Sequence, residues 1–215
     1  MQLLVGLGNP GPSYARHRHN VGFMAADAVA RHYSFAPFRA KFHGLCAEGV
    51  VDGHRLLILK PQTYMNDSGR SVAEAARFYK IAPEEIVAVH DEIDLKAGKI
   101  RAKLGGSSAG HNGLRSIDDH IGAGYWRVRV GVGRPEPGGN VEDYVLQNFA
   151  RADDAWLSPA LAAVAEALPL LLDGDAPGFM TKVALLTAPP EEAGPIDTAG
   201  AKKAAKTAPD DDDGI

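Results

Sequence analysis

The start of the chain places the strongest constraint on its fold. An apolar run, Leu3-Leu4-Val5, leads into the glycine-rich segment GLGNPG at residues 6–11. Residues 22–32 then space their apolar side chains as an amphipathic helix does. A strand that feeds a glycine turn and then a helix is typical of α/β folds. We therefore predict a first strand at residues 3–8 and a first helix at residues 22–32.

The glycines of this segment also match G-x-G-x-x-G, the fingerprint of a turn that binds a dinucleotide. That motif needs an acid at the end of a second strand, whereas the candidate acid, Asp27, falls inside the predicted helix. Pro10 and Gly11 also delay the helix, so its first N–H groups do not face a phosphate. We interpret the glycines as a sharp turn that points Asn9 into a cleft. A nucleotide-dependent oxidoreductase is the alternative, and thermal stabilisation by NAD or NADP would favour it.

Strand and helix patterns alternate along the rest of the chain. This alternation, with one hairpin whose turn is Asp52-Gly53, predicts the fold class. We expect an α/β protein with a single domain, a mixed, mostly parallel twisted sheet and helices on both faces. The other expected strands are residues 42–51, 54–59, 86–90, 99–104 and 126–132, and the other expected helices are residues 71–79, 114–121 and 158–172.

Local residues predict how two of these helices begin and end. Asn66, Asp67 and Ser68 supply N-caps for the helix at residues 71–79. Ser158 and Pro159 open the last helix. Pro169 should kink or divide that helix, because proline lacks the N–H that a helical residue donates.

Charge is distributed unevenly over a chain whose net charge is −4. Residues 188–215 carry seven acids and three lysines, and their low hydrophobicity and blocks of like charge predict a disordered charged tail. Residues 1–187, the predicted folded domain, hold 20 acids and 20 bases. Within that domain, residues 96–134, here called the basic segment, carry eight Lys and Arg against two Asp. Such a cluster can bind phosphates, or it can be an ordinary solvated surface.

Cysteine usage and hydropathy predict the compartment. The single cysteine, Cys46, excludes an internal disulfide and fits a reducing environment. No stretch approaches the ~18 apolar residues that span a bilayer, and the N-terminus lacks the basic region of a signal peptide. We therefore expect a cytoplasmic protein without a membrane segment.

Unusual polar residues cluster where the predicted strands end or helices begin. In mixed α/β sheets, ligands usually bind at the carboxyl ends of the strands. Amides hold a water or a carbonyl oxygen without titrating, and a histidine oriented by a carboxylate accepts a proton near neutral pH. Together these groups suit the attack of water on an acyl group. They are Asn9, Arg18-His19-Asn20, Tyr64-Met65-Asn66, His90-Asp91-Glu92 and the loop GGSSAGHNG at residues 105–113.

Each of these residues also has a purely structural interpretation. Asn66 can be a helix cap and His111 a surface loop residue, while Asp94 can bind backbone amides. Residues 106–110, GSSAG, match the G-x-S-x-G nucleophile elbow, but neither a sharp entry nor an apolar helix surrounds them. His17 and His19 hint at a metal site, yet no H-E-x-x-H, cysteine cluster or close third ligand accompanies them. We expect neither a serine nucleophile nor a metal.

Five ordered motifs resemble the bacterial-type peptidyl-tRNA hydrolases. The resemblance spans residues 2–185, and the order and spacing of the motifs make it specific, which no single motif would. The motifs are GLGNPG at residues 6–11, RHNVG at 18–22, KPQTYMNDSG at 60–69, HDEIDL at 90–95 and GHNGLRSI at 110–117.

This resemblance implies a monomeric enzyme without cofactor or metal that cleaves the ester joining a peptide to the terminal ribose of tRNA. His19 is then the general base and Asp91 the carboxylate that orients it. Asn9, Asn66 and Asn112 position the peptide, the water or the oxyanion. Tyr14, Met65 and His111 correspond to residues that line the cleft, and Lys103 and Arg129 correspond to contacts with tRNA phosphate.

The chain departs from the family pattern at two places. His17 stands where a threonine is common, beside the RHN motif, and residues 178–186 lack the usual Ala-Met-Asn ending. A tRNA-binding module without catalysis is the second alternative, and tight binding without ester cleavage would favour it. The set of His, Asp and Asn counts against it, since a pure binder needs no such set.

Overall fold

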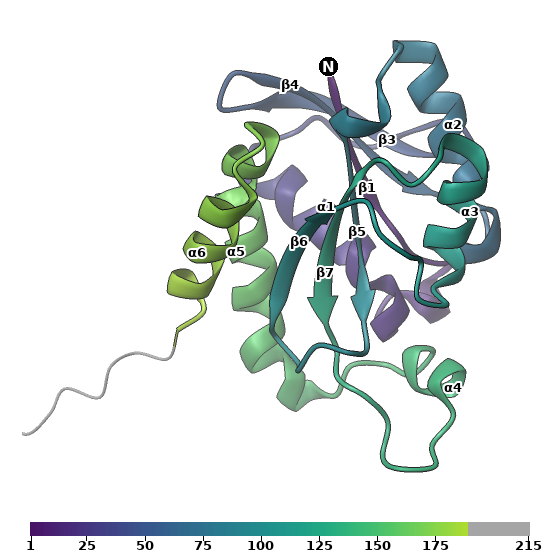
Figure 1. Cartoon of the computed structure of the whole chain (residues 1–215), viewed down its shortest axis with the longest axis vertical. Helices are drawn as coiled ribbons and strands as arrows, with labels where there is room; N and C mark the ends of the chain where they lie inside the picture. The colour runs from purple at the N-terminus through teal and green to yellow at the C-terminus, as the bar shows by residue number, and fades with distance from the viewer. Residues whose placement is uncertain (189–215) are drawn as a thin grey trace, which may run out of the picture.

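The computed structural model describes residues 1–188, and the predicted disordered tail lies outside them from residue 189 onward. Its centre is a seven-stranded sheet with the order β2-β3-β4-β1-β5-β7-β6 (Figure 1). The strands are β1 (Gln2–Gly6), β2 (Arg39–Lys41), β3 (Gly44–Val51), β4 (His54–Pro61), β5 (Ile86–Glu92), β6 (Ile100–Leu104) and β7 (Trp126–Gly131).

The four central strands run parallel. β1 lies between β4 and β5, and β5 pairs with β7. β3 is antiparallel to β4 in the hairpin, the short strand β2 is antiparallel to β3, and the edge strand β6 is antiparallel to β7. The prediction of a mixed sheet with a mostly parallel core is therefore confirmed.

Helices cover both faces of the sheet, as expected (Figure 1). On one face, α1, α5 and α6 pack on alternate residues of the central strands, such as Leu4 and Val89. On the other face, α2 and α3 pack on the intervening residues, such as Leu3 and Ala88. The helices are α1 (Val21–His32), α2 (Ser68–Tyr79), α3 (Asn112–Ile121), α4 (Val141–Val145), α5 (Asp154–Leu172) and α6 (Ala176–Leu186), with 3-10 turns at Pro12–Tyr14, Arg18–Asn20, Met65–Asp67, Pro83–Glu85 and Arg151–Asp153.

The first glycines bring α1 and β1 into backbone contact. A Cβ on Gly6 would lie 2.3 Å from the carbonyl oxygen of Gly22, and a Cβ on Gly22 would lie 2.4 Å from the backbone nitrogen of Leu7. Neither position accepts a side chain without a shift of the backbone. The glycine-rich start therefore serves the close crossing of a strand and a helix, and this crossing places Asn9 and His19 at the same end of the sheet.

The last long helix differs from the prediction in two ways. It begins at Asp154 rather than at Ser158, and Pro169 does not divide it, since the helix continues to Leu172. Pro169 cannot donate to the carbonyl oxygen of Ala165 one turn earlier. The hydroxyl of Tyr33, 3.1 Å from that oxygen, donates instead. A neighbouring element thus supplies the hydrogen bond that proline removes.

Helix starts also differ from the capping prediction. No side chain of residues 66–68 caps α2: Asp67 makes no capping bond, and the hydroxyl of Ser68 donates to the carbonyl of Met65. α3 begins at Asn112 instead of residue 114, because the ring of His111 caps it. The sequence patterns missed β2 and α4, which are three and five residues long, and also α6, which has 11 residues.

One helical stretch contradicts the expectation about apolar segments. Among the described residues, Arg151–Leu172 is long and apolar enough to cross a membrane by length and composition alone. In the fold, 56% of its most apolar window is buried, and α5 packs between α1 and α6. These contacts are those of a core helix in a folded domain.

Candidate active site

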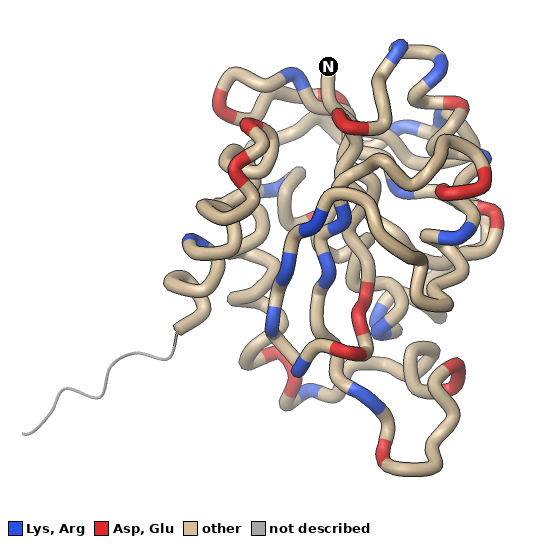
Figure 2. The backbone as a smooth tube through the Cα atoms, viewed as in Figure 1, with Lys and Arg blue, Asp and Glu red and all other residues tan. Residues whose placement is uncertain are grey.

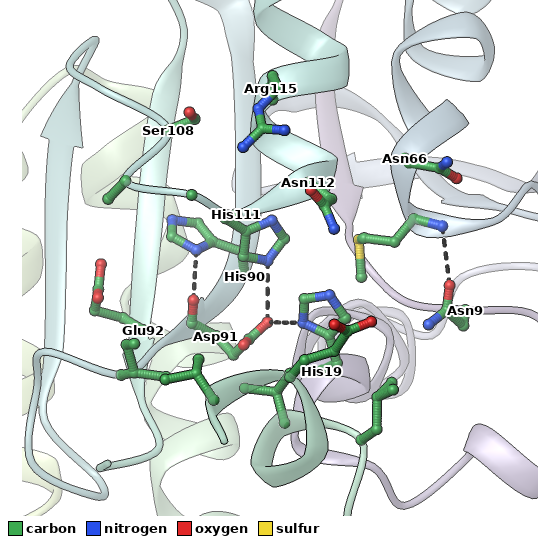
Figure 3. A pocket seen from close by; sticks show the side chains of 18 of the residues that line it. Asn9, His19, Asn66, His90, Asp91, Glu92, Ser108, His111, Asn112 and Arg115 are labelled. Atoms are coloured by element: carbon green, nitrogen blue, oxygen red, sulfur yellow. Dashed lines mark hydrogen bonds and ion pairs between the residues drawn. The ribbon is translucent and has the colours of Figure 1, made fainter. Parts of the chain in front are cut away.

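A cavity of about 830 Å³ opens at the carboxyl ends of the parallel strands β1 and β5 (Figure 3). Its lining comes from six separate segments of the sequence. Seven of the expected site residues line it: Asn9, His19, Met65, Asn66, Asp91, His111 and Asn112.

Asp91 lies at the centre of this site, near the end of β5, and is buried. Its Oδ1 lies 2.8 Å from Nδ1 of His19 and 3.0 Å from Nε2 of His111. Burial alone would raise the pKa of Asp91, but attraction to both histidines and the hydrogen bonds from their rings outweigh it. The pKa therefore lies well below its ordinary value of 3.8, and the carboxylate is ionised.

The ionised carboxylate fixes the protons on His19. A carboxylate without a proton can only accept, so Nδ1 of His19 donates to Asp91. In the neutral ring, Nε2 then carries a lone pair. Figure 3 shows this ring between Asp91 and the side of the cavity formed by Asn9 and Asn112. His19 is buried within the turn Arg18–Asn20, which places a base against the cavity wall.

The start of α3 fixes the protons on His111. Its Nδ1 accepts from the N–H of Gly113 at 3.1 Å and from that of Leu114 at 3.3 Å. The ring proton must then lie on Nε2, which donates to Asp91. His111 thus caps a helix with one nitrogen and positions the central carboxylate with the other.

The same three residues form the one group among the described residues whose atoms could hold a metal ion, all within 4.8 Å of one another. A histidine that ligates a metal through Nε2 normally donates its Nδ1 proton to an acceptor. Nδ1 of His111 instead faces two N–H donors, so a bound metal would break the cap of α3. The arrangement fits a proton-transfer site and does not fit a metal centre.

The side chain of Asn9 bonds to the protein through its amide oxygen, and its NH2 group bonds to no described residue. Its Oδ1 accepts from the N–H of Met65 at 2.9 Å. Its own backbone N–H and C=O bind the amide of Asn20 at 3.0 and 2.9 Å. Asn66 and Asn112 are exposed at the cavity, and neither side chain binds another described residue. Amide donors are therefore available to a bound molecule.

Two further histidines flank the centre. His90 donates from Nδ1 to the carbonyl oxygen of Asp91 at 2.7 Å. Burial, together with the neighbouring His111, lowers the pKa of His90 to about 3, so this ring is neutral. Burial and the nearby His19 lower the pKa of His17. Near neutral pH, neither ring adds a positive charge beside the general-base candidate.

A family model described as peptidyl-tRNA hydrolase matches residues 3–191. The chain belongs to this family. A peptidyl-tRNA hydrolase of Rhodospirillum rubrum is 54% identical over 203 residues, which cover 94% of this chain and 84% of that protein. One of Methylocella silvestris is 57% identical over 183 residues, covering 85% and 93%. The crystal structure of the Acinetobacter baumannii enzyme superposes with a TM-score of 0.80 at 41% identity, covering 85% and 94%.

Membership of the peptidyl-tRNA hydrolase family confirms the resemblance and the α/β fold. One expected cleft residue nevertheless lies elsewhere. Tyr14 is absent from the cavity lining and packs edge-on against the ring of His17, with ring centroids 5.1 Å apart. Residues 178–186, which depart from the family pattern, lie on α6. This helix packs on α5 and β6 and does not line the cavity.

The basic segment carries less free charge than its composition suggests. Three of its eight cations pair with acids: Arg127 with Asp118, Arg129 with Glu92, and Arg134 with Asp94. The other five are exposed and have no ion-pair partner among residues 1–188: Lys96, Lys99, Arg101, Lys103 and Arg115. Figure 2 shows a row of cations along β6 and β7. Lys103 and Arg129 lie on these strands, outside the cavity lining.

The sequence patterns also missed part of the lining of this peptidyl-tRNA hydrolase site. Glu92 lay within a motif but received no role. The apolar wall from α4 and its neighbour Leu146 carried no signal, because a five-residue helix shows too little periodicity. The loop at residues 105–111 is no nucleophile elbow, because the serine of the motif, Ser108, does not lie in a tight turn between a strand and a helix. β6 ends at Leu104, and α3 begins only at Asn112. The further lining residues are Tyr64, His90, Glu92, Ile93, Ser108, Ala109, Gly110, Arg115, Val141, Glu142, Val145 and Leu146.

Proposed function

We propose that this chain hydrolyses the ester bond between the peptide and the 3′-terminal ribose of peptidyl-tRNA, with His19 as general base. One observation carries the proposal: Asp91 accepts from His19 at 2.8 Å and leaves the other ring nitrogen free to take a proton beside the cavity. A carboxylate on the far side of the ring fixes the tautomer and stabilises the charged imidazolium that forms.

The reaction needs two proton transfers and no covalent enzyme intermediate. Nε2 of His19 takes a proton from water while the water oxygen attacks the ester carbonyl carbon. A tetrahedral intermediate forms, and its collapse breaks the bond between the carbonyl carbon and the ribose oxygen. The imidazolium of His19 then protonates that oxygen. The products are a peptide with a free carboxyl group and a tRNA with a free 3′-hydroxyl.

The amides stabilise charge and hold the substrate. Asn9, Asn66 and Asn112 each offer N–H donors at the cavity, and donors aimed at a developing oxyanion stabilise the transition state. Met65 supplies an apolar surface beside them. Because amides bind the peptide through its backbone, the site accepts many peptide sequences, as the recycling of tRNA from abandoned translation requires.

The acceptor end of tRNA lies along β6 and β7 in this proposal. Lys103 and Arg129 contact backbone phosphates there, which positions the ester without reading the sequence. We further propose that the protein acts as a monomer in the cytoplasm, without metal, cofactor or membrane. The relatives from Rhodospirillum rubrum and Methylocella silvestris, both more than 50% identical and named peptidyl-tRNA hydrolase, support the substrate class.

Replacing His19 tests the proposal. His19→Ala should reduce the hydrolysis of purified peptidyl-tRNA close to the uncatalysed rate, while thermal unfolding stays close to that of the wild type. His32→Ala, an exposed histidine at the end of α1, is the matched control and should keep full activity. Unchanged turnover by His19→Ala would exclude this residue as the general base.

A further inference from the structure

Glu92 connects the active-site cavity with the basic strands. Glu92 directly follows Asp91 on β5, and its buried side chain lines the cavity. Its Oε2 accepts from Nε and Nη2 of Arg129 at 2.9 and 2.8 Å. Its Oε1 accepts from the N–H of Asp94 at 3.0 Å. Both carboxylate oxygens are therefore used, and Glu92 has a single fixed orientation.

This contact fixes which edge of the Arg129 guanidinium faces outward. Nε and Nη2 form one edge of the planar group, and Glu92 occupies that edge. Nη1 binds no described residue, and the Arg129 side chain is 32% exposed. A guanidinium offers five N–H donors in a rigid fork, so an arginine held by one edge presents the other in a defined direction.

The other two paired arginines of the basic segment are arranged differently. Arg127 is buried, and its Nη2 and Nη1 donate to Asp118 and to the carbonyl of Ser107. The side chains of Arg134 and Asp94 are 64% and 49% exposed, and neither residue lines the cavity. Of the three pairs, the one formed by Arg129 and Glu92 combines a buried acid in the cavity with a partly exposed cation.

The sheet sets the distance between this pair and the catalytic centre. β5 and β7 are parallel neighbours in which Asp91 lies opposite Val130 and His90 lies opposite Arg129. Glu92 and Asp91 are consecutive residues of one buried strand. The orientation of Arg129 is thus coupled to the strand that carries the central carboxylate.

We propose that Glu92 is a positioning residue, which orients Arg129 toward a phosphate of the tRNA acceptor end at a set distance from the scissile ester. This inference rests on the proposed function, and it adds to that function a residue that takes no part in the chemical steps. Loss of the Glu92 charge has two opposed effects: it removes repulsion of phosphate, and it releases the guanidinium from its fixed direction. A control with the same change in charge separates them.

The first experiment compares Glu92→Gln with Asp94→Asn, which removes the same charge nearby but leaves Arg129 paired. Binding of deacylated tRNA is measured against salt, and hydrolysis is measured on peptidyl-tRNA and on a small N-blocked aminoacyl ester of adenosine. We expect Glu92→Gln to bind tRNA about tenfold more weakly than Asp94→Asn, with a salt slope lower by about 1. Its kcat/KM should fall more on peptidyl-tRNA than on the small ester. A purely structural role would affect both substrates alike.

The second experiment is a double-mutant cycle with Arg129→Lys, since lysine cannot contact Glu92 and a phosphate through two edges. If Glu92 acts through Arg129, Glu92→Gln should change tRNA affinity less than twofold in the Arg129→Lys background. Equal losses in both backgrounds, or tRNA binding by Glu92→Gln as tight as that of Asp94→Asn, would overturn the inference. Because deacylated tRNA needs no cleavage, its binding tests Glu92 even if the wild type proves inactive as an esterase.

Discussion

The cavity and the basic strands beside it differ in what their functional side chains contact. In the cavity, the carboxylate of Asp91 accepts hydrogen bonds from His19 and His111 at 2.8 and 3.0 Å, and all three side chains are largely buried. On β6, Lys103 and its neighbour Arg101 are exposed and have no ion-pair partner among the described residues. Directional bonds in a buried site fix geometry, whereas exposed cations attract phosphate at longer range and are screened by salt.

This difference predicts that changes in the two regions alter different properties. A change at His19, Asp91 or His111 should alter the rate of chemistry and the response to pH. A change on the basic strands should alter affinity and the response to salt. The following experiments test this separation, beginning with the largest expected effect.

Asp91→Asn should have the largest effect. The amide cannot stabilise the imidazolium of His19 as a carboxylate does, so kcat should fall about 10³- to 10⁴-fold. Single-turnover kinetics with saturating enzyme would measure this loss. The salt dependence of tRNA binding should stay as in the wild type, and a changed slope would mean that the two regions are not separate.

His111 allows its two roles to be separated. His111→Asn keeps a good N-cap for α3 but cannot reach Asp91, whereas His111→Ala loses both contacts. We expect both variants to lose up to about 100-fold in kcat, because a displaced Asp91 misplaces the general base. Only His111→Ala should also lose about 1 kcal/mol of unfolding free energy. Full activity of His111→Asn would show that the bond to Asp91 is dispensable.

Lys103→Ala tests the basic strands. It should raise KM for peptidyl-tRNA several-fold, leave kcat unchanged and lower the salt slope of binding by about 1. Arg31→Ala removes the same charge from the exposed end of α1 and is the control. If the two variants lower the slope equally, the effect comes from net charge and not from a phosphate contact.

The smallest expected effect concerns stability at acid pH. The pKa of His90 is about 3 in the folded chain and 6.5 ordinarily. Between these values the unfolded chain binds a proton that the folded chain does not, so the unfolding free energy should fall as pH drops below about 6.5. His90→Gln keeps a donor for the carbonyl of Asp91 but does not titrate. Its thermal midpoint should fall less between pH 7 and pH 5 than that of the wild type, and a parallel fall would exclude His90 as the cause.

The sequence was a good guide to the cavity because its residues follow strands or begin helices. Asn9 and Asp91 come at the ends of β1 and β5, and parallel strands place such residues at one edge of the sheet. His19 and His111 belong to short motifs whose order identified the family. Local sequence patterns were thus enough to predict a cavity residue wherever the end of a strand or a short motif determines its position.

Partners far along the chain could not be inferred in this way. Arg129 and Glu92 are 37 positions apart and meet only because β5 pairs with β7. The charge count of the basic segment therefore overestimated its free cations. Asn66 was expected both as a helix cap and as a residue of the cleft. α2 begins without a side-chain cap, and the asparagine is exposed at the cavity. The predicted charged tail stays a prediction.

The bond from Tyr33 to Ala165 has a consequence for the order of folding. The carbonyl oxygen of Ala165, to which Pro169 cannot donate, has this partner only when the hydroxyl of Tyr33, 132 positions earlier in the sequence, is in place. A ribosome releases Tyr33 long before Pro169, so α1 can already be docked on the sheet when α5 emerges. In an isolated peptide of residues 151–188 the carbonyl of Ala165 lacks this partner, so the helix should be less stable around Pro169 there than on the surface of the preformed N-terminal half.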